Sequence, residues 1–377
     1  MKRTPRSVSR LTLLWTVAFV GAVLSLLGAS MLGPAEMTTA ELWNHLLDPS
    51  SDNHEMARTI LQDIRLPRVL ASFAVGACLS LAGVLLQAST RNPIADPYLV
   101  GTSAGATLAA VTVATSVSTI GGLLGSDPTE WLVWLQPLAA FVGAMAAVSM
   151  AFWLARRDGP ASPERVLLAG LVLTAFAGAA TSVLLYRSSE LQLRAATQWL
   201  MGGVMIEQLW QLTPALFVLV LATVWSLLHA AQLNALALGT EAARGLGVDD
   251  GKILRNSVWL SSALAAVAVA LAGIVGFVGL LVPHGLRAIA GRDHRWLVPG
   301  SVLLGGALIA WADGLARVVV APGELPLGIL TALAGCPLLL GLLRAGRVQR
   351  GASEPGEEAP VTEHAPVVSA VETDQQI

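Results

Sequence analysis

The sequence predicts an all-α polytopic membrane protein with about ten transmembrane helices. Charged residues make up 13% of the 377-residue chain and apolar residues 54%, whereas about 25% of the residues in a soluble domain are charged. The mean hydropathy is +0.66. The apolar residues gather in runs of roughly 20, which is the length that an α-helix needs to cross a bilayer. This composition excludes an ordinary soluble domain.

Several apolar runs have the length of one crossing, and they lie at 11–32, 69–90, 98–118, 131–155, 166–186, 208–231, 297–319 and 327–343. The first run follows a basic N-terminus, as in a signal peptide. It is longer than the apolar core of a signal peptide, however, and no A-x-A cleavage site closes it. We therefore expect it to be retained as the first helix.

A further apolar stretch, 257–291, is too long for one crossing. As a single helix it would extend about 52 Å, against a hydrocarbon core of about 30 Å. Glycine and proline break helices, and Gly273, Gly276, Gly279 and Pro283 lie inside the stretch. We expect two shorter crossings here.

The distribution of basic residues supports an even number of crossings. If the N-terminus is cytoplasmic and the chain alternates, arginine and lysine concentrate in the inner loops, as the positive-inside rule requires. A single crossing at 257–291 would place the clusters around Arg292 and Arg347 outside. We therefore expect both termini in the cytoplasm, a transmembrane domain at 1–346, and a disordered tail at 347–377, which is rich in proline and glutamate.

The motifs of common enzymes are missing. The sequence has no G-x-x-x-x-G-K-[ST], G-x-S-x-G, H-E-x-x-H or C-x-x-C. Its two cysteines, Cys78 and Cys336, sit in separate apolar runs, and its six histidines do not cluster at ligand spacing. We expect no catalytic residue, no metal site and no bound cofactor, and hence a transport component that takes its energy from another protein.

A rigid turn is predicted where RNPIADP separates two apolar runs on the inner side. Pro93 and Pro97 each disfavour helical geometry in the residue before them, which is Asn92 in the first case and Asp96 in the second. Gly101 and Gly105 then follow at G-x-x-x-G spacing, which lets another helix approach closely. The stretch is either part of a leak-tight constriction or a connector with a packing glycine pair.

Two arginines, Arg65 and Arg68, stand at the outer start of the second crossing, in QDIRLPRVL. A cation in the first turn of a helix opposes the macrodipole, and the positive-inside rule disfavours arginine on this side. We expect a compensating partner. It is either a local acid, Glu55 or Asp63, or an acidic group on another protein.

An ionisable pair is predicted inside the ninth crossing, in ALIAWADGLARVV. Asp313 and Arg317 are four residues apart, so they share one helix face. Ionisable residues in a membrane span are costly and are usually paired or functional. A structural ion pair explains Asp313, whereas Arg317, beside Glu324, could also face a partner.

The longest inner loop, LNALALGTEAARGLGVDDGKILRN, is too apolar for a solvated linker. Thr240 can cap the start of a short helix, Gly245 and Gly247 can end it, and Asp249 or Asp250 can start the next one. Short helices of small residues would leave an apolar patch that needs a cover. We favour a cytoplasmic partner over burial within the chain.

Taken in this order, these stretches resemble the FecCD family, the permease subunits of type II ABC importers for iron–siderophores, haem and vitamin B12. The resemblance runs from about Thr38 to Leu343 and rests on RLPRVLASFAVGACLSLAGVLLQASTRNPIADPYLVGTSAGA, WLMGG, LGTEAARGLGV, GIVGFVGLLVPHGLRAIAGRDHR, ADGLARVV and ELPLGILTALAGCPLLLGLL. It implies a multi-pass subunit of a bacterial plasma membrane that pairs with a second permease copy or homologue. It also implies two ATPase subunits, which use the ATP, and an extracytoplasmic binding protein.

The resemblance implies roles for individual residues. The loop at about 232–256 corresponds to coupling helices that contact the ATPase, through Gly239, Glu241, Ala242, Gly245 and Gly247. Outer-face arginines that pair with glutamates of the binding protein correspond to Arg65, Arg68 and Arg317. Pathway and gate positions correspond to Asn92, Pro93, Gly101, Gly105 and Ser162. At the last of these the chain departs from the small polar run that the family often has, because Pro163 and Glu164 follow.

The function implied is translocation of an iron(III)–siderophore complex, with cobalamin or haem as the alternative cargo. A different class, the ion-coupled secondary transporter, would need carboxylates near the bilayer midplane. Asp313 is the only such candidate, and an arginine is already paired with it in sequence.

Overall fold

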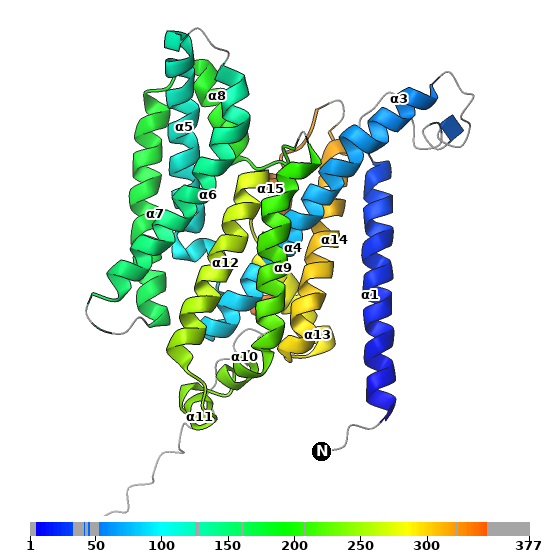
Figure 1. Ribbon diagram of the computed structural model, residues 1–377, viewed down its shortest axis with the longest axis vertical. Helices are drawn as coiled ribbons and strands as arrows, with labels where there is room; N and C mark the ends of the chain where they lie inside the picture. The colour runs from blue at the N-terminus through cyan, green and yellow to red at the C-terminus, as the bar shows by residue number, and fades with distance from the viewer. Residues whose placement is uncertain are drawn as a thin grey trace, which may run out of the picture.

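The chain forms a helical bundle in the computed structural model (Figure 1). The structure describes residues 5–32, 41, 44–45, 53–124, 128–157, 159, 162–206, 208–320 and 323–344. Side chains are described for all of these except 5–15, 117–124, 128–133 and 342–344. The expected tail, 347–377, lies outside the described residues.

Ten helices correspond to the predicted crossings: α1 (Pro5–Met31), α4 (Leu66–Thr90), α5 (Thr102–Leu124), α6 (Pro128–Ala155), α7 (Pro163–Tyr186), α9 (Thr213–Leu228), α12 (Asp250–Ala272), α13 (Val278–Ala290), α14 (His294–Val318) and α15 (Leu327–Arg344). Within the described residues, six helices are long and apolar enough to cross a membrane, and three more apolar helices are shorter. With α5 they run alongside one another in Figure 1. The all-α polytopic fold is confirmed.

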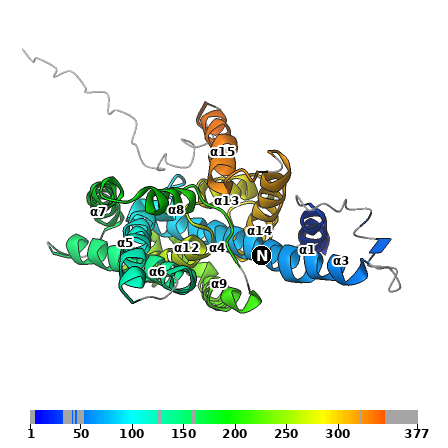
Figure 2. The same ribbon diagram turned by 90° about the horizontal axis from the view of Figure 1, so that it is seen from above.

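Helix α4 is the centre of the bundle, and Figure 2 shows it among α12, α13 and α14. It continues from a π-type turn at Ile60–Arg65, and 89% of its most apolar window is buried inside the chain. Glycines allow this crowding. A Cβ on Gly76 would overlap the main chain of Gly305 in α14, and a Cβ on Gly83 would overlap that of Gly279 in α13.

The long apolar stretch is broken between α12 and α13, as predicted. Helix α12 ends at Ala272, and Gly273 follows with a φ of 62°, a conformation that glycine adopts without a steric penalty. Phe277 has a φ of 69° before α13 begins. Pro283 lies inside α13, so the glycine, not this proline, makes the break. The 13 residues of α13 extend about 20 Å, less than a full bilayer.

Short helices occupy both ends of the bundle (Figure 1). At one end, which we call the α8 end, lie α3 (His54–Thr59) and α8 (Glu190–Leu200). At the other, the α11 end, lie α10 (Ala230–Leu236) and α11 (Thr240–Gly245). Helix α8 is amphipathic rather than apolar, so the search for apolar runs missed it. Its capping box, formed by Ser189 and Gln192, is the sequence signal that marks it.

Candidate functional site

Charged side chains from α4 and α14 meet at the α8 end. Arg68 presents a fork to Glu324, with its Nη1 and Nη2 atoms 3.0 and 2.8 Å from the two carboxylate oxygens. The Nε and Nη2 atoms of Arg68 also donate to Asp313 Oδ1 at 3.3 and 3.2 Å. The exposed fractions of the side chains are 22% for Arg68, 1% for Asp313 and 43% for Glu324. Arg68 thus joins a buried carboxylate to a surface one.

Two more arginines in this cluster are held by the end of α1. Arg317 Nε lies 3.3 Å from Asp313 Oδ2, which confirms the predicted pair, and Arg317 Nη2 donates to the main-chain oxygen of Ala29 at 3.4 Å. Arg65 Nη1 donates to the main-chain oxygen of Met31 at 3.2 Å. Both arginines are only 3% exposed. The last carbonyls of a helix carry partial negative charge, so α1 compensates these buried cations. We call Arg65, Arg68, Arg317, Asp313 and Glu324 the arginine cluster.

The compensating partners differ from those considered in the sequence. Within the described residues, neither Glu55 nor Asp63 forms an ion pair with Arg65 or Arg68. The partners come instead from α14, from the segment before α15 and from α1. Docking of the cluster to another protein stays a prediction.

The predicted turn after α4 is built from side-chain caps. Asn92 Oδ1 accepts a hydrogen bond from the Ile94 N–H at 3.1 Å, and Asp96 Oδ1 accepts one from the Tyr98 N–H at 2.9 Å. Burial raises the pKa of Asp96 to about 6, although the bond from Tyr98 acts in the opposite direction. The Tyr98 hydroxyl donates to the main-chain oxygen of Val275 at 3.0 Å. The turn is thereby tied to the break between α12 and α13.

The predicted glycine pair packs closely, but it joins α5 to two helices rather than one. A Cβ on Gly105 would overlap the main-chain oxygen of Gly143 in α6, and the reverse also holds. Gly101 has a φ of 89°, and its Cβ would lie 3.3 Å from the main-chain oxygen of Gly170 in α7. The Gly105–Gly143 contact requires residues without a side chain, and the positive φ of Gly101 favours glycine there.

Ser162 starts α7 beside the same turn. Its hydroxyl accepts a hydrogen bond from the Arg165 N–H at 3.4 Å, and Pro163 takes the first helical position. Further along α7, a Cβ on Gly170 would overlap the main chain of Leu99. The structure therefore brings the turn after α4, the start of α5 and the first half of α7 together.

Helix α11 projects from the end of the molecule (Figure 1). Gly239, with a φ of 107°, is its N-cap residue. Thr240, which was expected to cap it, is instead the first residue of the helix, because glycine alone suits the backbone conformation required before it. Leu238 and Leu246 flank the helix and are 69% and 67% exposed. These two side chains are left uncovered by the subunit, whereas Leu233, Leu236 and Ile253 of the same loop are buried within it.

The end of α11 is a Schellman motif. Gly247, with a φ of 79°, donates to the main-chain oxygen of Arg244 at 2.9 Å, and Val248 donates to that of Ala243 at 3.0 Å. Gly245 is the last helical residue, so the predicted role of the two glycines in ending the helix is confirmed. Ala243 is fully buried, which anchors the inner face of α11.

Helix α11 is joined to α12 by charged side chains. The Nε and Nη2 atoms of Arg244 lie 3.0 and 2.9 Å from the two carboxylate oxygens of Asp250. Asp249 caps the start of α12 by accepting from the Lys252 N–H at 3.0 Å. A two-point pair of this kind fixes orientation as well as distance, so α11 and the start of α12 can move together.

A polar network, built on an amide and a carboxylate that the sequence reasoning missed, joins α10 to α14. Asn234 Nδ2 donates to Asp293 Oδ1 at 2.8 Å, and Asn234 Oδ1 accepts from the main-chain N–H of His294 at 2.9 Å. Asp293 in turn caps the start of α14 by accepting from the Arg295 N–H. Asn234 stands six residues before α11, so the network links the segment that leads into α11 to the helix that carries Asp313 at its far end.

Similarity to known proteins agrees with this geometry. The FecCD transport family model matches residues 12–345. A hemin transport permease of Yersinia pestis is 40% identical over 87% of this chain and 94% of its own length. A cobalamin import permease of Halobacterium salinarum is 39% identical over 78% of this chain and 76% of its own.

A solved structure has the same fold. It shows an inward-facing conformation of a transporter assigned to the metal-chelate ABC type, and it has a TM-score of 0.73 and 26% identity. The match covers 91% of this chain and all of the solved chain. The family match extends over the bundle and the loop that contains α11. The chain therefore belongs to the FecCD transport family and is the non-catalytic membrane permease of an ATP-binding-cassette importer, whose ATPase partner uses the ATP.

Proposed function

We propose that this permease lines the pathway for a metal-bound tetrapyrrole, haem or cobalamin, rather than for the expected iron(III)–siderophore complex. The observation that carries the proposal is the 40% identity to a hemin permease over 94% of that protein, together with the 39% identity to a cobalamin permease. Both cargoes hold a metal inside a large macrocycle, so a pathway of one cross-section suits both. A second permease copy or homologue completes the pathway.

Transport in proteoliposomes tests the cargo. The permease is reconstituted with its ATPase and binding protein, and uptake of haem, cobalamin and a ferric siderophore is measured with ATP inside the vesicles. We expect ATP-dependent uptake of at least one tetrapyrrole above that of the siderophore, and no uptake with an ion gradient alone. Uptake of the siderophore without either tetrapyrrole would refute the cargo.

The α11 end faces the cytoplasm in this proposal, and α11 is the contact with the ATPase subunits, one for each permease copy. The contact residues are Gly239, Glu241, Ala242, Gly245 and Gly247. Support comes from the exposed apolar residues beside α11, from its fixed ends, from its ion pair with α12, and from the neighbouring α10, which Asn234 joins to the start of α14. Because those links are short and directional, a push on α11 is transmitted to α12 directly and to α14 through α10.

A large side chain at Gly245 tests this contact. A Cβ at this position would meet no atom within 4 Å in the subunit, so Gly245→Trp reports on the partner rather than on the fold. We expect Gly245→Trp to abolish uptake in vesicles, with yield and unfolding temperature unchanged. Gly245→Ala is the matched control and should transport normally. Equal uptake by both variants would refute the assignment.

The arginine cluster is proposed as the docking site for the extracytoplasmic binding protein. Arg65, Arg68 and Arg317 supply positive charge, and Arg68 is the most exposed of the three. A carboxylate of the binding protein would compete with Glu324 for the fork of Arg68. Arg68→Gln should therefore weaken capture of the binding protein, whereas Glu324→Gln should strengthen it. Unchanged capture by both variants would refute docking through Arg68.

The gate is proposed at the junction of α4, α5 and α7, with Asn92, Pro93, Gly101, Gly105 and Ser162. The support comes from contacts at this junction. Side chains cap two turns there, and glycines let the helices pack closely. A closely packed junction of this kind can seal a pathway while helices tilt. Gly101→Val, which strains a backbone with positive φ, should make reconstituted vesicles leak cargo without ATP. Vesicles as tight as those with the unaltered chain would refute the gate.

A further inference from the structure

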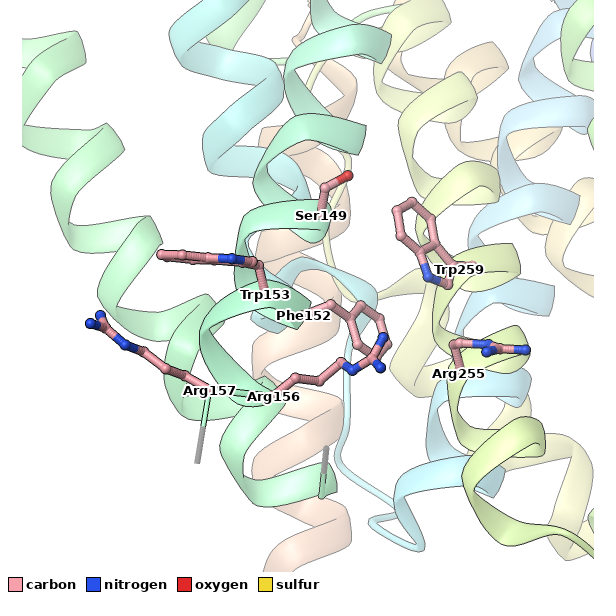
Figure 3. Close-up of a pocket in the computed structure, with 7 residues that line it drawn as sticks. All are labelled: Ser149, Phe152, Trp153, Arg156, Arg157, Arg255 and Trp259. Atoms are coloured by element: carbon pink, nitrogen blue, oxygen red, sulfur yellow. The ribbon is translucent and has the colours of Figure 1, made fainter. Parts of the chain in front are cut away.

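A pocket of about 400 Å³ opens between α6 and α12 (Figure 3). It is lined by Phe152 and Trp153 of α6, by Arg156 and Arg157 directly after that helix, and by Arg255 and Trp259 of α12. Its volume falls within the range of about 300–1,000 Å³ typical of sites for small molecules. None of the roles proposed above uses this pocket.

The arginines of the pocket have no acidic counterpart in the described part of the chain. Arg156, Arg157 and Arg255 are all exposed, and none forms an ion pair with a described carboxylate. Arg255 Nε donates to Asn256 Oδ1 at 3.4 Å, and the Arg157 guanidinium stands 5.9 Å from the Trp153 ring. Three cations gathered at one cleft attract an anion.

The rest of the wall is aromatic. The rings of Phe152 and Trp259 stack with centroids 5.9 Å apart and planes at 4°, whereas Trp153 is 60% exposed. Figure 3 shows each tryptophan at a different level along its helix from the neighbouring arginine. Arg255 lies one helical turn closer to the α11 end than Trp259 does. Arg157 likewise lies one turn closer to that end than Trp153. The ligand is thus expected to have an apolar part and an anionic end.

The position along α6 identifies the level of the bilayer. Trp134 and Trp153 are 52% and 60% exposed, and the residues that separate them span about 28 Å of helix, close to the hydrocarbon thickness of about 30 Å. Leu138 and Val142 between them are 59% and 56% exposed. Tryptophan marks both borders of a membrane-facing helix. Arg156 and Arg157, just beyond Trp153, therefore lie at the level of the lipid phosphates.

We propose that this pocket binds the phosphate headgroup of an anionic phospholipid, with the acyl chains along the exposed face of α6. The guanidiniums supply charge-assisted hydrogen bonds to the phosphate, and Trp153 and Trp259 contact the glycerol and upper chain. Basic pockets between helices on the cytoplasmic side are suited to such headgroups. The lipid joins α6 to α12, the helix that follows α11 directly.

Native mass spectrometry of the full-length chain tests the proposal, with palmitoyl-oleoyl phosphatidylglycerol or the matching phosphatidylcholine added in detergent. We expect the unaltered chain to retain phosphatidylglycerol in preference. R156Q/R255Q should weaken retention about thirtyfold, from the attraction of two basic residues to an anionic lipid. R187Q/R194Q, which removes two exposed arginines at the α8 end, should change nothing, and R156K/R255K should keep most of the binding.

Other outcomes would overturn the proposal. Equal retention by R156Q/R255Q and the unaltered chain would do so. Displacement of the lipid by inorganic phosphate at millimolar concentration would assign the site to free phosphate. Loss of ATPase copurification with lipid retention intact would assign the arginines to a protein carboxylate. A photoreactive phosphatidylglycerol on the unaltered chain provides a measurement that does not depend on folding of a variant: labelling must fall on α6 and α12, and labelling elsewhere alone would contradict the site.

Discussion

The arginine cluster and α11 lie at opposite ends of the molecule (Figure 1) and present opposite chemistry to their surroundings. In the cluster, charged groups turn inward: Asp313 is 1% exposed and Arg317 3%. At α11, apolar groups turn outward: Leu238 is 69% exposed and Leu246 67%. The cluster pairs its buried charges within the subunit. The α11 end leaves apolar side chains exposed, although their exposure to water is unfavourable.

This difference assigns the stability of the fold to one end of the molecule and the proposed coupling to ATP hydrolysis to the other. The buried charges hold α1, α4 and α14 in one arrangement, and removal of either partner of a buried pair leaves the other charge uncompensated. Helix α11 contributes little burial of its own, so its neighbours position it for a partner. Changes at the buried charges of the cluster should therefore alter the fold, whereas changes at α11 should alter transport.

The largest effect is expected from Asp313→Ala. It leaves Arg68 and Arg317 without their buried carboxylate and should lower the free energy of unfolding by about 3–5 kcal/mol. Thermal unfolding in detergent measures the loss. Glu324→Gln is the matched control, because Glu324 is 43% exposed, and it should cost less than about 1 kcal/mol. Equal losses would show that the buried carboxylate has no special role.

A smaller loss, about 3 kcal/mol, is expected from Gly105→Leu, because the new side chain would push α5 away from the main chain of α6. Gly178→Leu in α7 is the control, since a Cβ there meets no atom within 4 Å. Gly245→Trp at α11 should likewise leave the unfolding temperature in place. If Gly245→Trp destabilised the subunit as much as Gly105→Leu, stability and coupling would not be separate.

Asn234→Ala should affect both the stability of the fold and the coupling of transport to ATP hydrolysis. It removes the partner of Asp293 and His294, which should cost about 1–3 kcal/mol, and it should reduce uptake per ATP hydrolysed in the reconstituted transporter. Gln198→Ala, on the exposed side of α8, should change neither quantity. Unaltered coupling in Asn234→Ala would mean that the link from α10 to α14 transmits nothing.

The last effect concerns pH. Burial raises the pKa of Asp96 to about 6 in the folded chain, against about 3.9 in an unfolded one. Its contribution to stability is therefore fully present below pH about 4 and is lost as the pH rises through about 6. Asp96→Asn keeps a capping side chain and should flatten this part of the stability profile between pH 4.5 and 7.5. The same slope in both chains would contradict the shifted pKa.

Much of the bundle could be predicted because its signals are local. Apolar runs marked the crossings, and Gly273 marked the break between α12 and α13. The spacing of Asp313 and Arg317 gave their ion pair. Helix α8 was missed because its residues are amphipathic, although Ser189 starts a capping box that indicates a helix.

The contacts between distant segments could not be predicted. Arg68 meets Asp313 and Glu324 only because α4 packs against α14, and no spacing along the chain encodes that. The hydrogen bond between Asn234 and Asp293 joins residues that are 59 positions apart. Nothing in the sequence around either residue indicates that the other is its partner. The N-cap of α11 was misassigned to Thr240, since a side-chain cap was given more weight than the backbone freedom of Gly239.

Photo-crosslinking tests the central claim, that an ATPase drives this permease through α11. A photoreactive amino acid is placed at Leu246, which is 67% exposed beside α11, or at Tyr186, which is 93% exposed at the α8 end, and the assembled transporter is irradiated. The account predicts a crosslink to the ATPase from position 246 and none from position 186. A crosslink to the ATPase from position 186, or none from position 246 in an active transporter, would contradict it.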